Sequence, residues 1–149
     1  RAPTRVTLPD AELPLTPVGV HSAGKEAGQM AVPDDPNVGG WYRFGASPLD
    51  RTGAVVIAAH VDAARYGPGP LARLGRIPKG SLLTLSVSGR DVRYRIERVE
   101  IVPKDRLDPA ALFDAAGPAR LHLVSCGGDF DPQRGEYVAN VVATAFRVD

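Results

Sequence analysis

The chain has 149 residues, which is enough for one compact domain and too few to expect two. Its 18 basic and 17 acidic residues give a net charge of +1, so no strongly basic face and no nucleic-acid partner are expected. Its 16 glycines and 14 prolines favour short elements joined by turns over long helices. The single cysteine cannot form an intramolecular disulfide or a cysteine-rich zinc site.

The N-terminal part of the chain shows no strong periodic element. Residues 1–17 are rich in proline, and we expect them to form an extended lead-in along the surface. No apolar run approaches the roughly 20 residues that a membrane-spanning helix needs. Because the chain starts at Arg1 and not at Met, we expect any signal peptide or membrane anchor to lie outside it.

Strong patterns begin at residue 54. Six consecutive apolar residues, Ala54 to Ala59, predict a strand buried on both faces that ends at His60. One helical turn is expected around residues 71–74. Residues 81–102 alternate apolar and polar side chains around a Ser-Gly turn, which predicts a hairpin. The alternation changes parity near Glu97, which indicates a bulge or a change of face.

The C-terminal third predicts one helix and two strands. A short helix is expected over residues 108–117, with Asp108 as its cap and Gly117 at its end. Residues 120–126 read as a strand, 127–136 as a loop and 137–148 as a final strand. In total, the sequence predicts six to eight short strands and one or two short helices. This favours a mainly β chain folded as a closed or nearly closed barrel. A β-sandwich is the alternative.

Cys126 ends an apolar strand and precedes two glycines. A free cysteine is often a buried hydrophobic residue, but a strand end presents its side chain to a cleft. A reactive thiol needs a partner, usually a histidine. His122 shares the strand but lies about 13 Å away along it, and His21 lies in a turn-rich segment. His60 ends the other buried strand, so His60 and Cys126 form a plausible pair.

Several short motifs, in this order, resemble the sortases, which are cell-wall-linked cysteine transpeptidases of mainly Gram-positive bacteria. These motifs are "MAVP", "GWY", "HVD" and "CGG", at residues 30–33, 40–42, 60–62 and 126–128. The resemblance runs from about residue 15 to residue 148 and is greatest to the actinobacterial group called class E or class F, with class F favoured. It implies a closed barrel of eight strands and makes residues 18–149 the catalytic domain.

The resemblance also assigns site residues by position. It implies that Cys126 is the nucleophile, that His60 is the family histidine, and that Arg134 is the family arginine that stabilises the oxyanion. Arg147 lies too far along the last strand, and Val138, where many relatives place a charged residue, cannot take this role. Ser125 stands where the family usually has threonine.

The implied reaction joins two partners. A sorting-signal peptide similar to LPxTG is cleaved through a thioester, and an amine of a cell-wall precursor or a pilin lysine takes the acyl group. No cofactor and no metal are expected. The implied location is the extracellular face of the cell membrane, reached through an anchor outside this chain. The segment "LPLTP", Leu13 to Pro17, is a coincidence of composition or, alternatively, a mimic of the signal that occupies the groove.

The sequence leaves two alternatives to a sortase function. Papain-like peptidases and acyltransferases usually place the nucleophile at a helix N-terminus and the histidine later in the chain, whereas here the histidine precedes a cysteine that ends a strand. The other rival is a non-catalytic β-barrel binding module in which Cys126 is structural.

Overall fold

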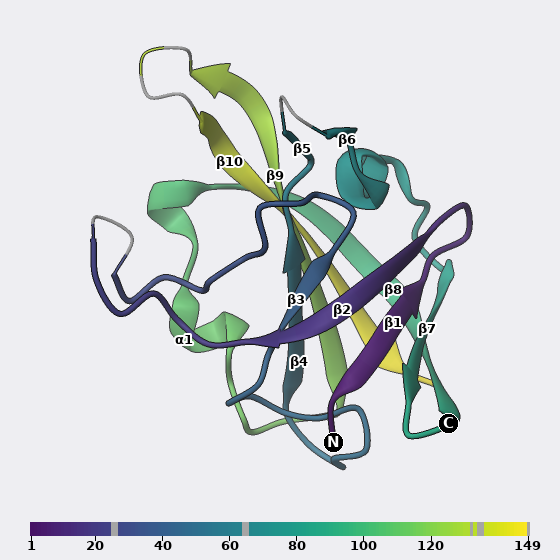
Figure 1. The fold of residues 1–149 in the computed structure, drawn as a ribbon. Coiled ribbons are helices and arrows are strands. Elements are labelled where there is room, and N and C mark those ends of the chain that lie inside the picture. Colours follow the sequence, from purple (N-terminus) through teal and green to yellow (C-terminus); the bar gives the residue numbers. More distant parts are fainter. Residues whose placement is uncertain (25–26, 64–65, 132, 134–135, 149) are drawn as a thin grey trace.

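The computed structural model describes residues 1–149 except 25–26, 64–65, 132, 134–135 and 149, and describes only the backbone of residues 63, 104, 126–131 and 136–138. Eight strands close into a barrel in the order β1-β2-β3-β4-β9-β10-β8-β7, and β5 and β6 form a separate two-stranded sheet (Figure 1). The predicted fold class, a mainly β closed barrel with short helices, is confirmed. No helix of the described residues is long and apolar enough to cross a membrane.

The elements are short except for the last three strands of the chain, and β9 and β10 extend past the barrel at the end where β5 and β6 lie (Figure 1). Both ends of the chain lie at the opposite end of the barrel (Figure 1). The strands are β1 (Pro3–Thr7), β2 (Glu12–Val18), β3 (Gly39–Tyr42), β4 (Ala54–Ala59), β5 (Asp62–Ala63), β6 (Gly67–Pro68), β7 (Leu82–Val87), β8 (Arg90–Pro103), β9 (Arg120–Asp131) and β10 (Glu136–Arg147). The helices are the 3₁₀ helices η1 (Pro70–Arg76) and η2 (Lys104–Arg106) and the α-helix α1 (Pro109–Leu112).

Two apolar clusters hold the barrel, one inside it and one on the outer face of β4, β9 and β10. Alternate residues of β4 divide between them: Val55, Ile57 and Ala59 point inward, while the other three belong to the outer cluster. All six are buried, as the continuous apolar run predicts. This strand is therefore covered on both sides, which makes it a rigid support for the residue that follows it.

The predicted hairpin and its irregularity are confirmed. Strands β7 and β8 pair through a turn at Ser88 and Gly89. The pairing of β8 with β10 skips one residue between Ile96 and Arg98, so Glu97 is the bulged residue. The bulge lets the apolar face of β8 change parity while the strand continues along the barrel.

The prediction that residues 1–17 form an extended lead-in along the surface is wrong. Residues 3–7 and 12–18 are the barrel strands β1 and β2, and β1 closes the barrel by pairing with both β2 and β7. Val6 and Leu13 have no exposed surface and lie in the inner cluster. The segment "LPLTP" is therefore part of the barrel wall and does not occupy a groove.

Two boundaries in the last third also differ from the prediction. The helix covers only Pro109–Leu112; Asp108 caps it as expected by accepting a hydrogen bond from the Ala110 amide at 3.0 Å. Residues 113–117 are irregular and end in Gly117, whose φ is +83°. The expected loop at residues 127–136 is mostly strand, because β9 continues to Asp131 and β10 begins at Glu136.

Candidate active site

Residue 60 directly follows strand β4, and residue 126 lies on the adjacent strand β9. Strands β4 and β9 are parallel neighbours, and their pairing ends with Ala59 opposite Ser125. His60 and Cys126 are each the next residue along the chain. Neighbouring strands are about 4.8 Å apart, so this register sets the backbones of the two positions close together.

A third residue lies at this level on the next strand. Strand β10 runs antiparallel to β9, and Asn140 is directly opposite Cys126. Asn140 has the parity of Val142, which belongs to the outer cluster, and it is half-buried. Sequence reasoning missed Asn140, because only the register of β9 and β10 shows which residue faces position 126.

The chain just after His60 is held by close backbone contacts. The Gly69 amide donates a hydrogen bond to the Val61 carbonyl at 2.8 Å, which closes the short β5–β6 loop at its base. Gly69 also packs directly on Pro36: an added Cβ would lie 2.3 Å from the Pro36 oxygen. The φ of Gly69 is −103°, which any residue adopts, so space and not conformation requires glycine here.

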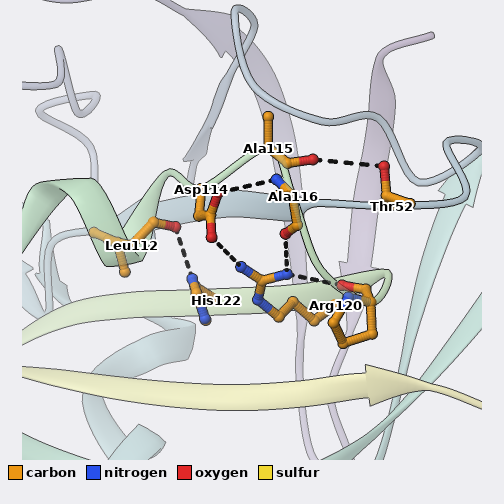
Figure 2. Close-up of polar contacts among 8 residues, drawn as sticks. Thr52, Leu112, Asp114, Ala115, Ala116, Arg120 and His122 are labelled. Carbon is orange, nitrogen blue, oxygen red and sulfur yellow. Dashed lines mark hydrogen bonds and ion pairs between the residues drawn. The ribbon is translucent and has the colours of Figure 1, made fainter.

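The segment between β8 and β9 covers part of the outer face. Leu112 of α1 is 8% exposed and packs in the outer cluster with residues of β4, β9 and β10. His122 is buried beneath it and donates from Nδ1 to the Leu112 carbonyl oxygen at 2.8 Å (Figure 2). Burial is the main cause that lowers the pKa of His122, and the charges of Arg120 and Arg98 lower it further. His122 is thus a structural strand residue, as expected.

Arg120 fixes the other end of this segment. Its Nη1 donates to the carbonyl oxygens of Ala116 at 2.9 Å and Pro118 at 2.8 Å, and its Nη2 lies 3.8 Å from Asp114 Oδ2 (Figure 2). The Arg120 side chain is only 11% exposed. The segment is therefore tied to β9 at two points, Arg120 and His122, and forms a fixed wall beside the strand that carries position 126.

Of the two candidate arginines, one can be placed. Arg134 lies outside the described residues, so its role stays a prediction. Arg147 is seven residues along β10 from Asn140, about 23 Å at the usual rise of a strand. Its Nη1 donates to the carbonyl oxygen of Pro48 at 3.3 Å and lies 3.5 Å from that of Asp50, at the end of the barrel where the chain begins.

No group of three or more histidine, cysteine, aspartate or glutamate side chains that could hold a metal ion is present within the part of the chain that the structure describes.

Comparison with known proteins agrees with this architecture. The sequence model of the family described as the sortase domain matches residues 11–148. No curated protein gives a significant match to the chain. Among solved structures, the lid mutant of sortase A from Corynebacterium diphtheriae is similar with 20% identity and a TM-score of 0.68, covering 97% of this chain and 69% of that one.

Two sortases of the C type are similar to the same extent. Sortase C from Clostridium perfringens is 14% identical with a TM-score of 0.65, over 97% of this chain and 68% of that one. Sortase C1 from Streptococcus agalactiae is 15% identical with a TM-score of 0.70, over 98% of this chain and 67% of that one. Identities this low show a common fold.

Because the family match covers nearly the whole chain, the chain belongs to the sortase family. Membership of this family supports a cysteine transpeptidase activity.

Proposed function

We propose that the chain cleaves an LPxTG-like sorting signal through a thioester on Cys126 and transfers the acyl group to an amine. What supports this reaction most is the register that brings His60 and Cys126 to the same level on β4 and β9, in a chain of the sortase family. His60 directly follows β4 and Cys126 lies within β9, and both strands are held in the barrel wall.

The steps use only side chains of this chain. The Cys126 thiolate attacks the carbonyl carbon of the scissile peptide bond, and a C–S bond and an oxyanion form. Arg134 stabilises the oxyanion through its positive charge. The oxyanion then collapses, the C–N bond breaks, and the His60 imidazolium gives its proton to the leaving amine. In the second half the acceptor amine attacks the thioester, loses a proton to His60 and releases the thiolate.

The reaction belongs at the outside of the cell. The acceptor is an amine of a cell-wall precursor or a pilin lysine, and the enzyme works at the extracellular face of the membrane through an anchor outside this chain. The short motifs around His60 and Cys126 favour the actinobacterial class F, with class E as the alternative. No cofactor takes part in these steps.

The test is turnover of a quenched fluorescent peptide that contains LPETG, with and without a glycine-based amine acceptor. We expect a Cys126 acyl-enzyme in mass spectrometry, slow hydrolysis without acceptor, and a transfer product with it. Cys126→Ala should abolish all three. If a thiol-directed probe does not label Cys126 of the native protein, and His60→Ala does not alter this, the chain is instead a binding module with a structural cysteine.

The two arginines give a paired prediction. Arg134→Ala should slow acyl-enzyme formation by about 10²–10³-fold, the usual loss when a donor to an oxyanion is removed. Arg147→Ala should leave that rate within a few-fold, because Arg147 lies far along β10 and contacts the Pro48 carbonyl. Single-turnover mass spectrometry measures both rates. The reverse result would transfer the role to Arg147.

A further inference from the structure

The pairing of β4, β9 and β10 brings the backbones of three polar residues to one level of the sheet. His60 follows β4, Cys126 lies on β9, and Asn140 lies on β10 directly opposite Cys126. Directly opposed residues of an antiparallel pair have Cβ atoms about 4.5–5.5 Å apart. A peptide carbonyl attacked by Cys126 is therefore within reach of a side chain at position 140.

Asn140 has the chemistry that a developing oxyanion needs. Its carboxamide carries two N–H donors and no charge that must be neutralised. The residue is half-buried, so water competes less for these donors than at an open surface.

The other residues of β10 near this level do not offer such a donor. Val142 has the same parity as Asn140 but is apolar. Ala139 and Val141 have the opposite parity, and both are apolar as well. Asn140 is thus the polar residue that the register sets beside the reacting carbonyl.

We propose that Asn140 is a catalytic residue that donates a hydrogen bond from Nδ2 to the oxyanion formed when Cys126 attacks the sorting peptide. This role rests on the proposed transpeptidase function. It supplements the positive charge that the proposed function assigns to Arg134. No bond to Asn140 forms or breaks, and its protonation state does not change.

The test separates oxyanion stabilisation from thiol activation. Asn140→Ala and Asn140→Asp are compared with the wild type in two reactions of Cys126: acylation by the LPETG peptide, and alkylation by iodoacetamide. Alkylation is a displacement at a saturated carbon and forms no oxyanion. We expect acylation to slow by about 10²–10³-fold in both variants, while alkylation of Asn140→Ala stays within about two-fold of the wild type.

Val142→Ala is the matched control, because it alters the same face of the same strand, next in the alternation, and removes no donor. It should lower thermal stability without changing the ratio of acylation to alkylation. If Asn140→Ala slows both reactions equally, Asn140 supports the thiol or the fold and the inference is wrong. If its acylation rate equals that of the wild type, the inference is also wrong. Failure of the wild type to acylate at all would instead overturn the proposed function.

Discussion

At the scale of single residues, the buried hydroxyl of Ser125 lowers the free energy of unfolding. It is 2% exposed, it lies beside the proposed nucleophile, and its Oγ is buried without a hydrogen-bond partner in the described part of the chain. An unsatisfied buried polar group typically costs about 1–3 kcal/mol. We predict that Ser125→Ala raises the free energy of unfolding by about 1 kcal/mol, which is about 2–4 °C in Tm for a chain of this length.

Ser47→Ala is the control for this prediction. Ser47 is also buried, but its Oγ donates to the Arg1 carbonyl at 2.6 Å and accepts from the Leu49 amide at 3.3 Å. Removing a satisfied hydroxyl leaves its partners unpaired, so this variant should be destabilised. Urea unfolding of both variants measures the difference. A destabilised Ser125→Ala would show that the Ser125 hydroxyl has a partner in solution.

The sequence predicted the positions of some site residues but not others, for a physical reason. His60 and Cys126 each end an apolar run, and buried parallel strands tend to end at one edge of a sheet, so their proximity follows from local pattern. Asn140 lies in the middle of a strand. Its place opposite Cys126 depends on the register of two strands, which the bulge between Tyr137 and Ala139 shifts and which no local pattern encodes.

At the scale of elements, His122 joins α1 to β9, and this contact makes stability depend on pH. Burial lowers the pKa of His122 in the folded chain below its usual value of about 6.5. As the pH falls below about 6.5, the unfolded chain therefore binds a proton that the folded chain does not, and the free energy of unfolding decreases. We predict that the chain unfolds more easily in acid because burial opposes protonation of His122, even though the hydrogen bond to the Leu112 carbonyl favours it.

The variant His122→Gln tests this link because glutamine does not titrate. At pH 7.5 it should be less stable than the wild type, since the packing around the ring is lost. By pH 5.5 the gap in the free energy of unfolding between the two should be smaller. Urea titrations at both pH values give the gap, and NMR of the imidazole gives the protonation state directly. A gap that is constant with pH would contradict a lowered pKa.

Element types were more predictable than element ends. The capping residue Asp108 correctly predicted the start of α1, but the helix ends after one turn. Beyond it, Asp114 accepts a hydrogen bond from the Ala116 amide, and Arg120 of β9 donates to the Ala116 carbonyl. The stretch "GGDFD" has the composition of a loop, yet it pairs with β10 as the end of β9. In both places, tertiary contacts override local propensity.

At the scale of the whole molecule, closure of the barrel depends on residues 1–17, where the sequence predicted no strand. Prolines usually mark edges or interruptions of sheets, and residues 1–17 hold four of them, so no strand was predicted there. The segment nevertheless supplies β1 and β2, whose partners β7 and β3 lie far along the chain. Without β1, the edges of β2 and β7 would be left unpaired.

The side chains of "LPLTP" allow a direct test of this role. Leu13 has no exposed surface, and it lies against Gly39 of β3 so closely that an added Cβ there would come within 2.7 Å of its Cδ2. Pro14, its neighbour in β2, is exposed. We predict that Leu13→Ala lowers the free energy of unfolding by about 2–5 kcal/mol, as is usual for a leucine removed from a core, whereas Pro14→Ala changes it little. Chemical unfolding measures both. If the segment were instead a removable mimic of the sorting signal, Leu13→Ala would leave stability unchanged and raise the rate of peptide turnover.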